Sequence, residues 1–321
     1  MKVGVIGTGH LGQHHVRVYH ELAECELVGI ADINEQIVSD MGKKYDVPAY
    51  TDYHELLDKV DAVSVATPTS THGAITLDAI AKGCHVLVEK PISDNLESAD
   101  EMIKAAKDAG VILQVGHIER FNPGVLAMAK YVNQPRFLES NRLGPLAERI
   151  TDVGVVVDLM IHDIDLILAL IDSPLVRVEA IGVPILTERE DIANARIRFE
   201  NGCIADLTVS RVSLKTERKL RLFQPDTYLS LNYLTRKLQV YKKELDKNTN
   251  KPKVSVETVE APNEDALTME LSSFCEVIKS KGIPVVSGET GRNALQLALE
   301  ITKQIESGLA TIENIPIGIN P

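Results

Sequence analysis

The chain has 321 residues, of which 44% are hydrophobic and 25% charged, and its formal net charge is −12 at pH 7. These proportions suit a globular protein of about two domains and exclude a disordered, fibrous or collagen-like chain. The acidic balance, with no run of Lys or Arg, argues against a phosphate-backbone partner such as DNA or RNA. We therefore expect a small-molecule partner or another copy of the chain, and no nucleic acid.

The four cysteines, Cys25, Cys84, Cys203 and Cys275, lie far apart and form no CxxC motif. Disulfide and zinc frameworks are therefore not expected, and a reduced, cytoplasmic setting fits better. The chain enters a strand-like run at Val3–Ile6, so no signal peptide is expected. No apolar stretch approaches the roughly 18 residues of a membrane helix, so no membrane partner is expected.

The first 120 residues alternate short apolar runs with helical patterns. Strands are expected over Val3–Ile6, Leu27–Ala31, Ala62–Ala66, Val86–Val88 and Val111–Val115. Helices are expected from the first turn to about Leu22, over Ala74–Lys82 and over Leu96–Asp108. Continuous Val, Ile and Leu runs that alternate with helices are typical of a parallel sheet covered on both faces. This predicts an α/β Rossmann domain, a doubly wound parallel sheet, over residues 1–120.

The pattern changes after Arg120, and strands with hairpin breaks become dominant. They are expected over Val176–Gly182, Ala195–Phe199, Cys203–Arg211, Lys219–Phe223 and Leu238–Tyr241, with Asn201-Gly202 as a two-residue hairpin turn. Helices are expected over Asn122–Val132, Asp152–Ile171, Asp265–Lys279 and Gly291–Ser307. We predict an α+β domain over residues 121–321, with a mostly antiparallel, open-faced sheet. Its exposed face predicts self-association.

A glycine-rich segment joins the first strand to the first helix and matches the pattern GxGxxG. Its residues are Gly7, Thr8, Gly9, His10, Leu11 and Gly12. The glycines permit a tight turn, close approach of the backbone to a pyrophosphate and close helix packing, and the helix N-terminus attracts the phosphates. Asp32, 20 residues after Gly12, could accept hydrogen bonds from the ribose hydroxyls. No Arg follows within Ile33–Gln36 to neutralise a 2′-phosphate, so NAD is favoured over NADP.

Two further motifs follow later strands: Thr67-Pro68-Thr69-Ser70-Thr71-His72, and Glu89-Lys90-Pro91. Together with the glycine segment they make the chain resemble the Gfo/Idh/MocA family of NAD(P)-dependent oxidoreductases. The resemblance continues through Arg120-Phe121-Asn122-Pro123 and the D-x-x-x-H pair Asp158 and His162, with Asp165 following. It implies that Thr67, Pro68, His72, Glu89 and Lys90 contact the cofactor, and that the protein forms homodimers or homotetramers.

The chain departs from the family pattern at two places. It reads Thr151-Asp152-Val153-Gly154-Val155-Val156-Val157 where the family often has glycines, and His117 stands where many members have another residue. Both departures concern the substrate more than the reaction. Val115–Pro123 and Asp158–Asp165 resemble most the branch that acts on nucleotide sugars, including UDP-N-acetylglucosamine 3-dehydrogenases.

A dehydrogenase needs a proton acceptor and a charge that stabilises the developing alkoxide. Lys90 follows a strand at the edge where open α/β sheets bind ligands, so its ammonium could supply that charge. Without the motif, it would be read as a solvated surface lysine. Asp158 and His162 are four residues apart and share a helix face, so the carboxylate could orient the imidazole for proton transfer. A buried structural histidine beside a helix acid is the alternative.

Three residues are assigned to the substrate. His117 and Arg120 could hold a carboxylate, amide or phosphate, or could form a structural interdomain pair. Asp165 could bind a substrate hydroxyl or simply be a solvated helix acid. His10, His14 and His15 suggest a metal site, but no acidic or Cys partner is near them in sequence, so no metal is expected.

These features predict an NAD-dependent enzyme that oxidises a sugar hydroxyl. The resemblance points to the 3-hydroxyl of a UDP-N-acetylhexosamine. Three alternatives stay open: an inositol or free-sugar dehydrogenase, a glycosidase that recycles NAD in each turnover, and a non-catalytic NAD-sensing or interaction protein. The division of proton transfer between Lys90 and His162 also stays open.

Overall fold

The computed structural model describes residues 1–145, 153–246 and 250–312, and it separates into two compact units. The first unit contains Met1–Phe121 and Glu264–Leu295, and the second contains Asn122–Asn263 and the chain from Gln296 onward. The sequence placed everything after residue 120 in the second domain. In the structure, Glu264–Leu295 instead packs with the first unit, because its helix buries Leu271 and Phe274 in that unit's core.

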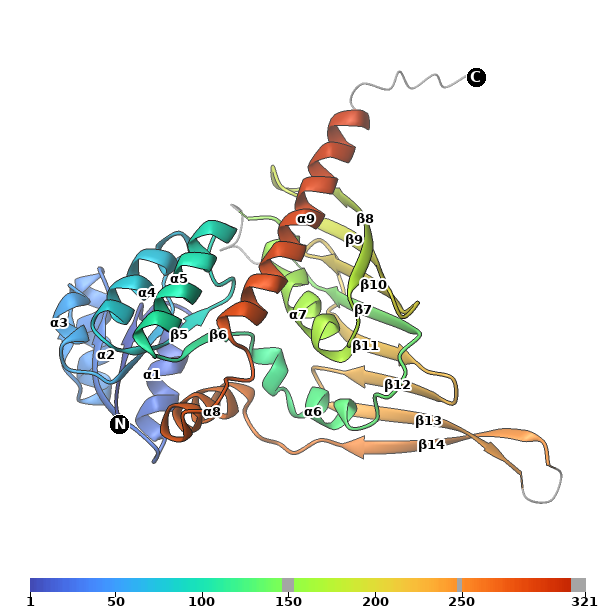
Figure 1. Ribbon diagram of the computed structural model, residues 1–321, viewed down its shortest axis with the longest axis horizontal. Helices are drawn as coiled ribbons and strands as arrows, with labels where there is room; N and C mark the ends of the chain where they lie inside the picture. Colours follow the sequence, from blue (N-terminus) through green and yellow to red (C-terminus); the bar gives the residue numbers. More distant parts are fainter. Residues whose placement is uncertain (146–152, 247–249, 313–321) are drawn as a thin grey trace. The chain divides into compact units, whose positions relative to one another are not determined.

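The first unit is built on a parallel six-stranded sheet with the strand order β3-β2-β1-β4-β5-β6, which is the Rossmann order. The strands are β1 (Lys2–Ile6), β2 (Glu26–Ala31), β3 (Ala49–Tyr50), β4 (Ala62–Val65), β5 (His85–Glu89) and β6 (Leu113–Gly116). The helices are α1 (Gly12–Glu21), α2 (Glu35–Tyr45), α3 (His54–Leu57), α4 (His72–Ala81), α5 (Leu96–Ala109) and α8 (Ala266–Ser280), with short 3₁₀ turns η1 (Thr69–Thr71) and η2 (Ile118–Phe121). The predicted doubly wound sheet is confirmed (Figure 1).

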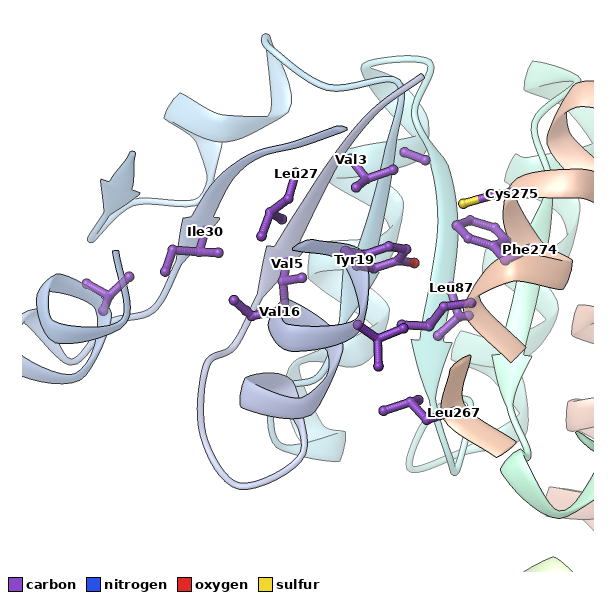
Figure 2. Packing of buried hydrophobic residues seen from close by; sticks show 14 residues of the cluster. Val3, Val5, Val16, Tyr19, Leu27, Ile30, Leu87, Leu267, Phe274 and Cys275 are labelled. Atoms are coloured by element: carbon purple, nitrogen blue, oxygen red, sulfur yellow. The ribbon is translucent and has the colours of Figure 1, made fainter. Parts of the chain in front are cut away.

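One core of this unit brings together residues from both ends of the chain. Val3 and Val5 of β1 pack with Tyr19 of α1 and Phe274 of α8, and all four are at most 1% exposed (Figure 2). The Tyr19 hydroxyl is paired with the Ser64 hydroxyl at 2.9 Å, which satisfies the polar end of this buried side chain. The C-terminal segment therefore completes a core that the N-terminal residues begin.

The second unit is built on an eight-stranded sheet with the order β14-β13-β12-β11-β7-β10-β9-β8. The strands are β7 (Phe137–Leu143), β8 (Leu175–Val183), β9 (Ile192–Phe199), β10 (Ile204–Ser210), β11 (Glu217–Phe223), β12 (Thr227–Asn232), β13 (Lys237–Leu245) and β14 (Pro252–Glu260). β7 and β10 run parallel and the other neighbours are antiparallel. The predicted, mostly antiparallel sheet is confirmed, although the sequence did not identify β7, β12 or β14.

The two faces of this sheet differ in burial. In β7, Leu138, Ser140 and Arg142 are buried and alternate with partly exposed neighbours. The buried face is covered by α6 (Pro123–Ala129), the π-helical turn η3 (Val156–Met160), α7 (Ile161–Leu170) and the later residues of α9 (Gly288–Ile312) (Figure 1). The other face carries the alternate side chains, as expected for an antiparallel sheet with one solvated side.

Two element boundaries matter for the site. Helix α4 begins at His72, two residues before the expected start, so His72 occupies its first turn. The expected helix over Asp152–Ile171 begins in the structure as the π turn Val156–Met160 before α7 starts at Ile161. Thr151 and Asp152 lie outside the described residues. Over the described chain, no helix is both long and apolar enough to cross a membrane.

Candidate active site

The glycine segment after β1 has the shape that a dinucleotide requires. Gly7 has a φ of +88°, and a Cβ there would lie 2.6 Å from the Ala66 carbonyl oxygen. A Cβ on Gly12 would collide with the Gly7 carbonyl, whereas a Cβ on Gly9 would meet nothing within 4 Å. Gly7 and Gly12 therefore allow the turn and the helix to close. Gly9 leaves the backbone open, as close approach of a pyrophosphate requires.

Asp32 links the end of β2 to this glycine segment. Its Oδ2 accepts a hydrogen bond from the Thr8 N–H at 2.7 Å and from the Thr8 hydroxyl at 3.1 Å, and its Oδ1 accepts one from the Asn34 N–H at 2.9 Å. These donors hold the carboxylate at the carboxyl end of β2, where it can still accept from a ribose. His10 and Leu11 are exposed in the same segment. The structure thus links the two parts of the predicted fingerprint, the glycine segment and Asp32, through Thr8.

His72 joins the two loops that carry the other family motifs. Its Nδ1 lies 2.9 Å from the Pro91 carbonyl oxygen, and its Nε2 lies 2.9 Å from the Thr67 carbonyl oxygen. Burial lowers the pKa of His72, although both carbonyls oppose that effect. A neutral imidazole can donate to only one of the two. The Thr71 hydroxyl adds bonds to the Thr67 hydroxyl and the Pro68 carbonyl, both at 2.8 Å. His72 is therefore buried inside this junction.

Glu89 and Lys90 stand at the carboxyl end of β5. The Glu89 Oε1 lies 3.0 Å from the Nε2 of His15 on α1, and its Oε2 accepts from the Lys90 N–H at 3.2 Å. The peptide bond between Lys90 and Pro91 is cis. Lys90 is partly exposed, as a residue that meets a ligand must be. The sequence suggests His15 only as a candidate metal ligand, and no pattern in it indicates the contact with Glu89.

His117 and Arg120 follow β6. His117 is completely buried, and its N–H donates to the Val115 carbonyl at 2.8 Å. Arg120 lies in η2 and donates through Nη2 to the Val285 carbonyl at 3.3 Å, within the first unit. This contact ties Arg120 to the C-terminal segment of the unit. A role for His117 and Arg120 in holding substrate, or as an interdomain pair, stays a prediction.

Asp158, His162 and Asp165 lie on consecutive turns of the second unit. Asp158 falls within the π turn, His162 in the first turn of α7, and both are partly buried, whereas Asp165 is 1% exposed. The π turn is held at its start by Glu190, whose carboxylate accepts from the Val156 N–H at 3.2 Å. Such turns within helices occur frequently at functional sites. The sequence predicted an uninterrupted helix here, because apolar periodicity alone does not register a single wider turn.

A buried ion pair next to His162 was not predicted. Arg142 of β7 donates through Nε to the Asp163 Oδ2 at 2.8 Å and through Nη2 to Oδ1 at 3.1 Å, and the Ser140 hydroxyl donates to Oδ1 at 2.9 Å. The side chains of Arg142 and Asp163 are only 4% and 1% exposed. This bidentate geometry anchors α7 to the sheet. No motif marks either residue, and nothing in the sequence indicates that these two residues, 21 positions apart, form a pair.

A second buried pair supports the entry to the π turn. Arg211 donates through Nε to the Asp191 Oδ1 at 2.7 Å and through Nη1 to the Val153 carbonyl at 2.7 Å. The Asp191 Oδ2 accepts three backbone N–H bonds, from Ile185, Leu186 and Thr187. Burial raises the pKa of Asp191, but these bonds outweigh it and hold the pKa well below its usual range. Across residues 1–145, 153–246 and 250–312, no three His, Cys, Asp or Glu side chains gather as metal ligands would.

Comparisons with known families agree with this architecture. A family described as "Oxidoreductase family, NAD-binding Rossmann fold" matches residues 1–117, and the "GFO/IDH/MocA C-terminal domain" matches residues 133–225. The second match covers β7 to β11 and the helices between them, including Asp158 and His162.

Among proteins with curated functions, the chain is 36% identical to a UDP-N-acetylglucosamine 3-dehydrogenase from Acidithiobacillus ferrooxidans, over 96% of this chain and 98% of that one. It is 28% identical to a myo-inositol 2-dehydrogenase from Thermotoga maritima, over 95% and 96% of the two chains. A solved structure of the Acidithiobacillus enzyme superimposes with a TM-score of 0.90 at 35% identity, over 96% of this chain and 99% of that one.

Proposed function

The chain belongs to the Gfo/Idh/MocA family of NAD-binding oxidoreductases, and within that family we propose that it oxidises the 3-hydroxyl of a UDP-N-acetylhexosamine. The observation that carries this proposal is the similarity to the Acidithiobacillus enzyme, which extends over nearly the full length of both chains. An oxidised nucleotide sugar of this kind would be a precursor of amino or uronic sugars.

The proposal assigns the cofactor to the first unit. Gly7, Gly9 and Gly12 would receive the pyrophosphate, and Asp32 would accept from the ribose hydroxyls. Thr67, Pro68, Glu89 and Lys90 would belong to the segments that receive the nicotinamide ring, and His72 would support them from its buried position between the Thr67 and Pro91 carbonyls. Bound NAD supplies the hydride acceptor. A negative charge at Asp32 would repel a 2′-phosphate, which supports NAD over NADP.

The proposed chemistry divides between two groups of side chains. Lys90 would donate a hydrogen bond to the reacting oxygen and stabilise its developing negative charge. His162 would accept the hydroxyl proton at a ring nitrogen, and Asp158 would stabilise the imidazolium that results. The preceding π turn supports this assignment, because it displays Asp158 one turn before His162. Asp165, His117 and Arg120 remain candidates for holding the sugar or its phosphates.

A second candidate substrate is an inositol or a free sugar. The observation in its favour is the similarity to the Thermotoga myo-inositol 2-dehydrogenase, which also spans nearly the whole chain. Lys90, Asp158 and His162 would serve the same roles on a polyol ring. The two candidates differ only in what binds beyond the reacting ring.

A substrate panel tests the proposal. Purified protein with NAD is mixed with UDP-N-acetylglucosamine, UDP-N-acetylgalactosamine, myo-inositol or glucose, and NADH absorbance is followed. We expect NAD to be reduced with a UDP-sugar and with neither of the other two compounds. Reduction with inositol alone would favour the second candidate. Binding of NAD with no reduction by any compound would favour a sensing protein, and release of free sugar without net NADH would indicate a recycling glycosidase.

We further propose that the chain works in the cytoplasm as a homodimer or homotetramer. The free cysteines and a nucleotide-sugar substrate support that compartment. Self-association is supported by the less buried face of the second sheet, where Phe137, Phe223, Tyr228 and Tyr241 stack across four strands with ring centroids 4.5–5.7 Å apart. Light scattering with Tyr228→Lys tests this: a smaller mass than the wild type is expected, and an unchanged mass would contradict this face as the interface.

A further inference from the structure

The carboxylate of Glu89 is held from three sides within the first unit. His15 of α1 approaches Oε1 at 3.0 Å, the Lys90 N–H donates to Oε2 at 3.2 Å, and Gly116 of β6 lies against its flat face. A Cβ on Gly116 would lie 3.0 Å from the carboxylate carbon, so a larger residue could not stand there unless Glu89 moved. Three elements therefore define one position for this side chain.

The His15 contact is the strongest of the three restraints. The side chains of His15 and Glu89 are 1% and 11% exposed, so little water can replace the interaction. Burial raises the pKa of Glu89, but the hydrogen bond and charge of His15, with the charge of Lys90, outweigh it and lower the pKa. A buried carboxylate that loses such a partner must rotate toward solvent or take up a proton. Rotation removes the acceptor that fixes the Lys90 backbone, and protonation weakens it.

We propose that His15 is a positioning residue for Lys90, acting through the Glu89 carboxylate. The imidazole holds Oε1, so that Oε2 stays in place to accept from the Lys90 N–H. The position of the Lys90 backbone then determines where its side chain starts, and hence where its ammonium group can reach. This inference rests on the proposed role of Lys90 in the reaction. It also connects α1, whose N-terminus receives the cofactor pyrophosphate, to the strand end that carries the reacting lysine.

Substitutions at His15 separate positioning from simple stability. His15→Gln can place an amide N–H close to the position of the imidazole Nε2, whereas His15→Leu removes the donor at similar volume. We expect His15→Leu to lower kcat about 10- to 100-fold, because small displacements of catalytic groups have effects of that size. His15→Gln should recover most of the activity. The Kd of NADH should change less than threefold in both.

A double-substitution cycle tests the route through Glu89. If His15 acts through the carboxylate, His15→Leu should cost less than threefold in kcat when it is introduced into Glu89→Gln. Val18→Ala serves as the control, since Val18 is also buried on α1 but belongs to the apolar cluster of Val3, Val5 and Tyr19. It should lower the melting temperature and leave kcat unchanged.

Three results would overturn the inference in an active enzyme: equal kcat losses in both backgrounds, no rescue by His15→Gln, or a tenfold weaker Kd for NADH in His15→Leu. The last result would mean that His15 serves the glycine segment instead. A wild-type protein that reduces NAD with no compound of the panel would contradict the proposed function itself, and the inference would fall with it.

Discussion

The two units hold their functional groups by different physical means. In the Rossmann unit, Asp32 and His72 are positioned largely by backbone amides and carbonyls within short loops. In the sheet unit, the helix that carries His162 is anchored by a buried charge pair, Arg142 and Asp163. Backbone partners survive most substitutions, whereas a buried ion pair fails when either member is removed. Changes in the loops that hold Asp32 and His72 should therefore cost activity without costing the fold, whereas loss of Arg142 or Asp163 should cost both together.

Lys90→Met tests the first half of this contrast and should have the largest effect. The variant removes a charge from a partly exposed position at the end of β5. We therefore expect kcat to fall about 10²- to 10⁴-fold, while the protein still binds NADH and its melting temperature changes little. Lys82→Met is the matched control, because Lys82 is an exposed lysine of the same unit, paired with Asp58. Wild-type kcat in Lys90→Met would exclude the lysine from the reaction.

Arg142→Met tests the second half. It leaves Asp163 buried without its cation, so we expect the free energy of unfolding to fall by about 3–5 kcal/mol in urea denaturation. Pairing it with Asp163→Leu should restore much of that loss. Arg196→Met is the control, since Arg196 pairs with Asp206 on the same sheet but its side chain is 50% exposed. Arg196→Met should lower the free energy of unfolding by less than about 1 kcal/mol. An equal loss of stability in Arg142→Met and Arg196→Met would contradict the special role of the buried pair.

Asp32→Ala sharpens the account of the cofactor loop. The ribose would lose a charged acceptor, so the Kd of NAD should rise about 10- to 100-fold, matching the 1.5–3 kcal/mol typical of such bonds. The Kd of NADP should fall or stay the same, because the carboxylate of Asp32 no longer repels the 2′-phosphate. Asp40→Ala, at an exposed position on α2, should leave both constants unchanged. A parallel loss for NAD and NADP would mean that Asp32 only supports the loop.

The smallest effect concerns pH. Since burial lowers the pKa of His72 below its unfolded value of about 6.5, the unfolded chain binds the proton more readily. The stability that the neutral His72 contributes to the folded state is fully present above about pH 6.5. It is lost as the pH falls through the lower pKa that His72 has in the folded state. We expect the melting temperature to fall from pH 7.5 to 5.5, and less steeply in His72→Gln. His20→Gln, at an exposed position, is the control; an unchanged slope in His72→Gln would contradict the assignment.

The same contrast explains what the sequence could predict. The Thr8–Asp32 contact spans 24 residues, but it belongs to a fingerprint whose spacing is set by one strand–helix–strand unit. The Arg142–Asp163 pair spans a similar distance, yet it depends on how a helix lies across a sheet, which no local pattern encodes. The π turn at Asp158 could not be predicted for a related reason. Its wider helical spacing depends on contacts with Glu190 and with the sheet, which lie far away in sequence.

The segment Glu264–Leu295 shows the limit for domain boundaries. Its helix was predicted closely, over Asp265–Lys279 against Ala266–Ser280 in the structure. Its membership of the first unit was not predicted, because an apolar helix face does not identify the core it fills. Elements were therefore predictable from local pattern, and their assignment to a core was not.

The most direct test of the central claim follows the hydride itself. UDP-N-acetylglucosamine deuterated at C3 is incubated with the protein and NAD, and the reduced cofactor is examined by mass spectrometry. We predict reduced cofactor one mass unit heavier than with unlabelled sugar, and no such increase when the label is at C4. Deuterium transfer from C4, or no transfer from any position of the sugar, would contradict the account.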